Sequence, residues 1–153
     1  MDAQAYTTAV FSKTIAINAP AKLVWAALTE PHLMKQWMSP DNPLEIITDW
    51  TIDRPIFMRG SHYDMPFENY GMVLQCQPNV LLSYTHLSSV SNLADVAESY
   101  SILSFALAEE EGETMLTFNI RNFPTDAIYR HLAFYWNVTL EVLKRVVEGA
   151  VQL

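Results

Sequence analysis

The chain has 153 residues, of which 50% are hydrophobic and 17% charged, a composition typical of a folded domain rather than of a disordered segment. Seventeen acidic residues against nine basic ones leave a formal net charge of −8, which argues against nucleic acid or an anionic membrane surface as the main partner, because both select clustered lysine and arginine. The single cysteine, Cys76, excludes an internal disulfide and fits a reducing compartment.

The length predicts a single domain over residues 1–153, large enough to bury a full hydrophobic core. The first residues lack the basic segment and apolar stretch of a secretory signal. No apolar run approaches the roughly 18 residues that indicate a membrane span. We therefore expect a cytoplasmic protein with no membrane span.

In the first part of the chain, the spacing of hydrophobic residues changes from every second residue, as in a strand, to about every fourth, as in a helix. Residues 9–18, AVFSKTIAIN, alternate well enough to predict a strand. Residues 21–38, AKLVWAALTEPHLMKQWM, place apolar side chains at helical spacing. Pro31 divides this segment, because proline is tolerated in the first turn of a helix but not inside one. We predict two short helices, with Leu33, Met34 and Trp37 on the buried face of the second.

From residue 44 to residue 122 the period falls to two, which predicts a series of strands. Turn-forming sequences separate them, and Gly112 is expected at the tip of the last hairpin. Sequential strands with short connections favour an antiparallel meander. The candidate strands cover residues 45–50, 55–63, 68–77, 80–88, 99–110 and 113–122.

Residues 124–151, PTDAIYRHLAFYWNVTLEVLKRVVEGAV, carry apolar side chains at three- and four-residue steps and predict one long amphipathic helix. Thr125 or Asp126 is the expected N-cap, and Gly149 the expected end. At 1.5 Å per residue such a helix spans roughly 35 Å, enough to lie across a whole sheet. The order of elements predicts an α+β fold.

Five segments then point to a known family, in order and over nearly the whole chain. They are INAPAKLVWAALTEPHLMKQWM, PIFMRGSHYDMPFENYGMVLQCQP, LLSYTHLS, GETMLTFNIRNF and FYWNVTLEVLKRVVE. Through them the chain resembles the homologues of the activator of the heat-shock-protein-90 ATPase, within the START-like or SRPBCC superfamily, also called helix-grip proteins.

The resemblance implies a helix-grip fold. A curved antiparallel sheet of about six or seven strands would wrap around the C-terminal helix over a pocket, with two short helices after strand 1. Residues 52–54 and the stretch FENYG, residues 67–71, depart from the family pattern near the expected mouth of that pocket.

His86 interrupts an apolar strand face, because Leu82, Tyr84 and His86 share one side of LLSYTHLS. Three interpretations remain open: a hydrogen-bonded structural histidine, a polar contact in a ligand cavity, or a catalyst. The family commonly has a large aromatic residue at this position, which favours a space-filling role over a reactive one.

We predict no catalytic residue, no metal and no cofactor. The four histidines show no metal-binding spacing. The chain also lacks a GxSxG motif, a phosphate-binding glycine loop and a dinucleotide fingerprint. Ser83 should face away from His86 on the same strand, which disfavours a nucleophile–base pair between them.

The remaining candidates are aromatic and apolar side chains that belong either to the core or to a ligand pocket, since small-molecule sites are concave, apolar and furnished with a few polar contacts. Arg59 is either a solvated charge at a sheet end or a cation at the pocket mouth that holds a carboxylate. The predicted ligand-binding residues are Trp37, Met58, Arg59, Tyr84, His86, Phe105, Phe118, Ile120, Tyr135 and Trp136.

Three functions follow from these observations. The first is non-enzymatic binding of a small hydrophobic or aromatic ligand between sheet and helix, where hydrophobic burial supplies affinity. The second is a chaperone-associated stress-response interaction module, with a chaperone or a second copy of the chain as partner. The third is a cyclase- or hydrolase-like enzyme that uses His86 as its acid or base.

Overall fold

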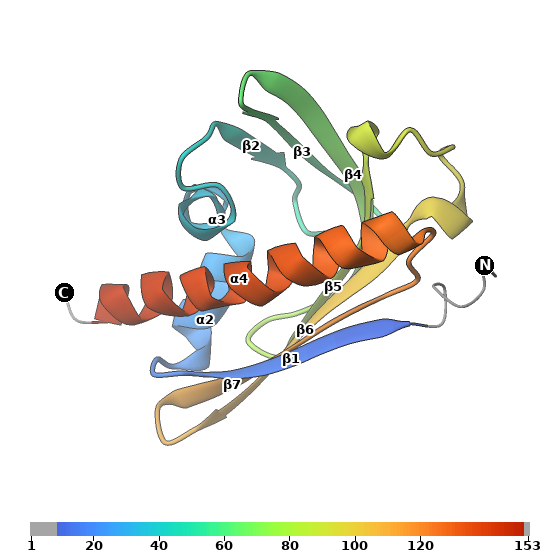
Figure 1. Ribbon diagram of the computed structural model, residues 1–153. Coiled ribbons are helices and arrows are strands. Elements are labelled where there is room, and N and C mark those ends of the chain that lie inside the picture. Colours follow the sequence, from blue (N-terminus) through green and yellow to red (C-terminus); the bar gives the residue numbers. More distant parts are fainter. Residues whose placement is uncertain (1–8, 152–153) are drawn as a thin grey trace.

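The computed structural model describes residues 9–151, which form a curved sheet wrapped around one long helix (Figure 1). The sheet has seven strands in the order β1-β7-β6-β5-β4-β3-β2, and all neighbouring strands are antiparallel. The long helix α4 (Asp126–Val151) crosses the concave side, and α2 (Ala21–Thr29) and α3 (Pro31–Met38) lie beside its C-terminal half. The predicted α+β helix-grip fold is confirmed.

The strands follow the predicted segments closely, and the first of the six candidates differs most. It ends at Ile47 rather than at residue 50, because the chain turns at Trp50, whose φ is 59°. The strands are β1 (Val10–Ile17), β2 (Leu44–Ile47), β3 (Pro55–His62), β4 (Met65–Gln77), β5 (Leu81–Ser88), β6 (Ser101–Glu110) and β7 (Glu113–Arg121). Short 3-10 turns, η1 (Ser89–Ser91) and η2 (Ala97–Ser99), connect β5 to β6.

The helix boundaries have local causes. Glu30 is extended between α2 and α3, as expected for a residue before proline, and Pro31 opens α3. Thr125 caps α4, since its Oγ1 accepts a hydrogen bond from the Ile128 amide at 3.1 Å. The prediction that Gly149 ends α4 is wrong: the helix continues to Val151, and a glycine within a helix weakens it without ending it. None of the helices in residues 9–151 is both long enough and apolar enough to cross a membrane.

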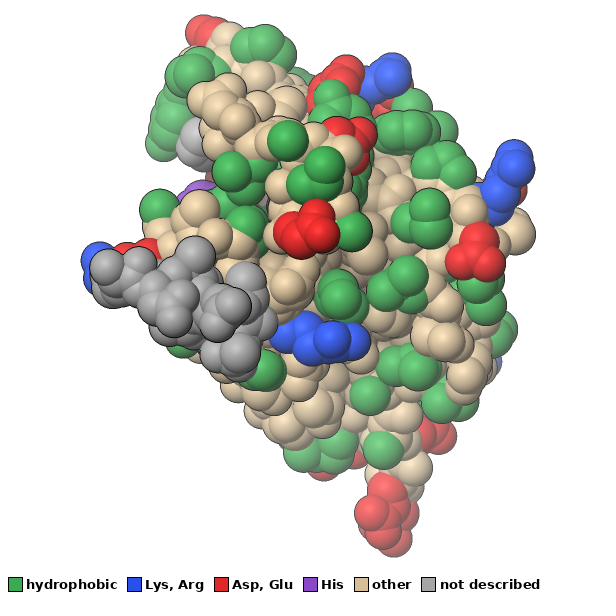
Figure 2. Space-filling model, turned by 90° about the vertical axis from the view of Figure 1, so that its right-hand side faces the viewer, with side chains coloured by type: hydrophobic (Ala, Val, Ile, Leu, Met, Phe, Trp, Pro, Cys, Tyr) green, Lys and Arg blue, Asp and Glu red, His purple; other side chains and the backbone are tan. Residues whose placement is uncertain are grey.

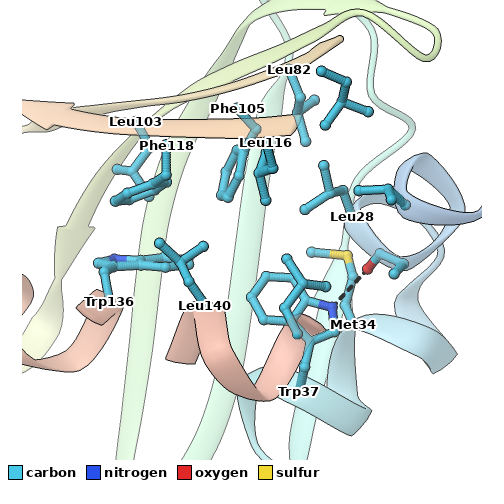
Figure 3. Packing of buried hydrophobic residues seen from close by; sticks show 14 of the residues in the cluster. Leu28, Met34, Trp37, Leu82, Leu103, Phe105, Leu116, Phe118, Trp136 and Leu140 are labelled. Atoms are coloured by element: carbon cyan, nitrogen blue, oxygen red, sulfur yellow. Dashed lines mark hydrogen bonds between the residues drawn. The ribbon is translucent and has the colours of Figure 1, made fainter. Parts of the chain in front are cut away.

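An aromatic cluster fills the space between the sheet and the middle of α4 (Figure 3). The Trp136 ring stacks on Phe118 of β7 with centroids 4.6 Å apart, and it meets Phe105 of β6 edge-on at 5.7 Å. Trp37 joins from α3, with its ring centroid 6.1 Å from that of Trp136. The Trp37 indole also donates a hydrogen bond to the Ala27 carbonyl at 2.8 Å, which ties α3 to α2.

The sheet bends most tightly where β4 passes β5. The register shifts between Val73 and Gln75, which marks an irregularity of the kind that increases strand twist. At Gly71 a Cβ atom would lie 1.8 Å from the Thr85 carbonyl oxygen and 3.2 Å from Ile56. Only glycine permits the two backbones to approach this closely, so Gly71 sets the path of the central strands.

Gly71→Ala should therefore destabilise the fold, because the added methyl group forces β4 away from β5. Overpacking of this kind costs about 1–3 kcal/mol, and more where backbone must move. The free energy of unfolding, measured by urea denaturation, reports the loss. Gly149→Ala is the matched control, since a Cβ there meets no atom within 4 Å, and it should leave stability equal or slightly higher. Equal unfolding midpoints for Gly71→Ala and the unsubstituted chain would contradict this account.

Candidate functional site

The C-terminal half of α4 is packed tightly against the sheet and the short helices. Leu140 and Leu143 are 0% exposed, and Val147 is 3% exposed. The strand residues opposite the middle of the helix are equally enclosed, since Phe105, Phe118 and Ile120 are also 0% exposed. These side chains fill the space themselves, and they stabilise the fold by removing apolar surface from water.

Apart from the buried Leu132, a set of half-buried side chains lies on the N-terminal half of α4, on β4 and on β5. We call this set the half-buried inner face. It comprises Phe67 and Asn69 of β4, His86 and Ser88 of β5, and Ile128 and Tyr135 of α4.

The strand register places the polar members of this set on the concave side. Asn69 lies opposite both the buried Met58 and Ser88, and His86 lies two residues before Ser88 on the same strand. On α4, Ile128 and Tyr135 lie seven residues apart and so share one stripe of the helix.

His86 lies at the centre of this face. It is directly opposite Ser101 of β6, whose hydroxyl donates to the Asn122 carbonyl at 3.3 Å. Burial, with a smaller contribution from the nearby His131, lowers the pKa of His86 to about 4, so its imidazole is neutral at physiological pH. The residue is nevertheless only half-buried by its accessible surface. The lowered pKa and the remaining accessible surface are both explained if the imidazole lies deep in the protein and still borders open space.

Two tyrosines connect the half-buried inner face with the aromatic cluster. Tyr84 is 3% exposed, stacks on Phe105 at 6.1 Å and contacts the Trp50 ring at 5.9 Å; burial raises the pKa of Tyr84. The Tyr135 hydroxyl donates to the Met38 carbonyl at 3.1 Å, and burial raises the pKa of Tyr135 as well. Both phenols are therefore neutral at physiological pH.

Arg59 lies on the convex side of the sheet, opposite to its buried neighbour Met58. Its Nε is 3.2 Å from Oε1 of Glu68, and its Nη1 is 3.9 Å from Oε1 of Glu45. The Glu68 carboxylate also accepts a hydrogen bond from the Tyr70 hydroxyl at 2.6 Å. Arg59 thus borders an open surface groove of about 660 Å³ between α3 and β2, at a distance from the aromatic cluster.

The structure brings most of the predicted ligand-binding residues together. Met58 and Ile120 are buried in the same cluster, and His86 lies at its edge. Ring contacts link the other six: Trp37, Tyr84, Phe105, Phe118, Tyr135 and Trp136. Asn69 was missed because its face depends on the register between β3 and β4, which the strand sequences do not specify. The sequence pattern places Trp50 at the end of a strand, so it gives no signal for the contact of this ring with Tyr84. Within residues 9–151 no three histidine, cysteine or acidic side chains gather as metal ligands would.

Both the sequence and the fold of this chain are similar to those of known proteins. The sequence model of the family described as "Activator of Hsp90 ATPase homolog 1-like protein" matches residues 18–148. None of the curated proteins matches the chain significantly.

Solved structures share the whole fold. A Cytophaga hutchinsonii protein solved in solution is 26% identical with a TM-score of 0.79, covering 96% of this chain and 99% of its own. A Chromobacterium violaceum protein is 19% identical with a TM-score of 0.78, covering 91% and 96%. DynU16, from the dynemicin biosynthetic locus, is 18% identical with a TM-score of 0.70, covering 92% of this chain and 48% of its own. The last two show the fold alone.

The lowered pKa of His86 predicts a loss of stability in mild acid. The unfolded chain takes up a proton near pH 6.5, whereas folded His86 resists protonation until about pH 4, so acid favours unfolding across that window. The difference between the two pKa values lowers the free energy of unfolding by about 3 kcal/mol between neutral pH and pH 4. Urea unfolding between pH 7.5 and 4 should therefore show a steeper loss for the unsubstituted chain than for His86→Gln. Parallel pH profiles of the two proteins would contradict this prediction.

Proposed function

Because the chain belongs to the family of activator of Hsp90 ATPase homolog 1-like proteins, whose fold holds a helix over a concave sheet, we propose that it binds a small apolar or aromatic molecule on the half-buried inner face. The ligand would lie between β4, β5 and the N-terminal half of α4. No reaction is proposed, and the role of the site would be to enclose and carry the molecule.

The observation that supports this proposal is the change in burial along α4. Leu140, Leu143 and Val147 are sealed. Nearer the N-terminus, Leu132 is 7% exposed, but Ile128 and Tyr135 remain half-buried. Apolar and aromatic side chains that stay partly in contact with water are stabilised when an apolar ligand covers them. The sealed half can meanwhile keep the fold intact without a ligand.

The surface offers a route to this face. Figure 2 views the molecule from the N-terminal end of α4, and its outline is notched between the upper lobe, where the β3–β4 hairpin lies, and the helix below. A histidine side chain is visible in the notch, and hydrophobic side chains gather on the lobe above it. Tyr63 and Met65 of this hairpin are 85% and 66% exposed. A notch of this composition suits the passage of an apolar molecule.

The hydroxyl groups of Ser101, opposite His86, and of Ser83, on the same strand, support a binding role rather than a catalytic one. The Ser101 hydroxyl donates to Asn122, and the Ser83 hydroxyl donates to the Leu103 carbonyl at 2.7 Å. Neither proton is directed at the imidazole, as a nucleophile–base pair requires. The geometry therefore favours recognition over acyl transfer.

Naphthalene, a two-ring apolar probe, should raise the melting temperature of the protein. At a free concentration of 100 times its Kd, a ligand specific for the native state adds about 2.7 kcal/mol of stability, or roughly 5–10 °C for a domain of this size. Ile128→Trp should remove most of this shift, because a larger side chain fills the space at the inner face. Differential scanning calorimetry and native mass spectrometry measure the shift and the complex.

Phe134→Ala is the matched control for this experiment. Phe134 lies on the outer side of α4, where it is 73% exposed, so its removal should leave naphthalene binding unchanged. If neither naphthalene nor other one- and two-ring compounds shift the melting temperature or remain bound, the proposed function is wrong. A loss of binding in Phe134→Ala but not in Ile128→Trp would move the site to the outer surface of the helix.

A second candidate function rests on that outer surface. Phe134 and Val138 lie one turn apart on α4 and are 73% and 48% exposed, an arrangement that suits contact with another protein. The family name describes an activator of the Hsp90 ATPase. If this chain acts in that way, adding it should raise the ATPase rate of the cognate chaperone, and Phe134→Ala should weaken the effect. No change in rate and no complex by gel filtration would exclude this function.

A further inference from the structure

The half-buried inner face holds two polar side chains that have no hydrogen-bond partner among residues 9–151. Neither the His86 imidazole nor the Asn69 amide makes a side-chain hydrogen bond to any described residue, whereas the neighbouring Ser101 and Tyr135 hydroxyls are both bonded to carbonyls. In the same part of the chain no fully buried side-chain nitrogen or oxygen lacks a partner. The polar atoms of His86 and Asn69 must therefore reach open space rather than being sealed in the core.

These two side chains are close to each other and point the same way. Ser88, which lies opposite Asn69, follows His86 by two residues on β5, so all three share the concave side of two adjacent strands. Between them they offer hydrogen-bond donors and acceptors of both kinds, since a neutral imidazole has one of each and an amide has both. Phe67, Ile128 and Tyr135, the apolar members of the half-buried inner face, are partly buried and pack against the hydrophobic core.

Fixed charges are placed elsewhere. Arg59, Glu45 and Glu68 form ion pairs on the opposite face of the sheet. His86 itself is neutral at physiological pH because burial lowers its pKa to about 4. His131, whose charge also lowers the pKa of His86, lies on α4 and is exposed. A carboxylate drawn onto this face would lose its hydration without gaining a cationic partner, and that exchange is unfavourable.

We propose that the ligand of this site carries one uncharged hydrogen-bonding group, a hydroxyl or a carbonyl, on an apolar or aromatic body, and that His86 and Asn69 hold that group. This inference rests on the proposed function and narrows its ligand class: phenols, alcohols and ketones are accepted, and carboxylic acids are rejected. The site thus differs from one in which a cation at the pocket mouth captures an acid.

Three matched probes test the inference: naphthalene, 2-naphthol and 2-naphthoate, titrated at pH 7.5 by isothermal calorimetry. 2-Naphthol should bind roughly three- to tenfold more tightly than naphthalene, the ratio expected for one neutral hydrogen bond. 2-Naphthoate should bind at least about tenfold more weakly than 2-naphthol, because its charge is not compensated. This comparison needs no substitution, so it cannot be lost to misfolding.

Substitutions then test which residues cause the preference for 2-naphthol over naphthalene. His86→Phe should lose most of the preference for 2-naphthol while keeping its affinity for naphthalene, and His86→Gln should restore part of the preference because glutamine also donates and accepts. Asn69→Leu should reduce the preference independently. His32→Gln is the control, since His32 is 74% exposed and pairs with Glu30 on α3's first turn.

The outcomes separate the two proposals. Equal binding of naphthalene and 2-naphthol, tight binding of 2-naphthoate, or a preference that persists in both His86→Phe and Asn69→Leu would overturn the inference and leave the proposed function standing. Failure of all three probes to bind the unsubstituted chain would overturn both.

Discussion

The stacking of Trp136 on Phe118 attaches the long helix to the sheet, and the other packing of the molecule is arranged around this contact. The two rings are nearly parallel, with centroids 4.6 Å apart, and the rings of Phe105, Trp37 and Tyr135 surround them. Aromatic pairs of this kind add about 0.5–1.5 kcal/mol each beyond the area they bury. Because Trp136 lies near the middle of α4, the contact holds the helix at one place and leaves its two halves with different surroundings.

This division assigns stability and recognition to different parts of one helix. The helix contacts α2, α3 and β1, and beyond Trp136 its side chains Leu140, Leu143 and Val147 are sealed. Before Trp136 it carries the half-buried Ile128 and Tyr135 beside the buried Leu132. The bend of the sheet contributes to the difference, because the close approach of Gly71 to Thr85 and the irregularity at Val73 set the course of β4. A ligand can therefore be exchanged at one end while the core at the other end stays packed.

The distribution of charge supports the same division. Lys13 of β1 pairs with Glu141 on the outer side of α4 at 3.1 Å, and Arg59 pairs with Glu68 on the convex side of the sheet. Ion pairs at such exposed positions contribute little to stability. Their effect here is to keep formal charge away from the concave side, where His86 and Asn69 supply uncharged polar groups instead.

Hydrophobic periodicity in the sequence was sufficient for the elements and for most of the core. The change from period two to helical spacing is local, as are Pro31 between the short helices and the Thr125 cap, so the α+β order and the inward placement of Phe105 and Phe118 could be predicted. The side of the sheet on which Arg59 lies, the turn at Trp50 and the exposure of Asn69 could not, because each depends on a partner distant in sequence: Glu68, Tyr84 and Ser88. The decisive case is His86. Alternation along β5 shows that it points inward, but only the curvature of the sheet and the attachment of α4 at Trp136 decide that it borders open space, since that depends on where the other wall of the concave side comes to rest.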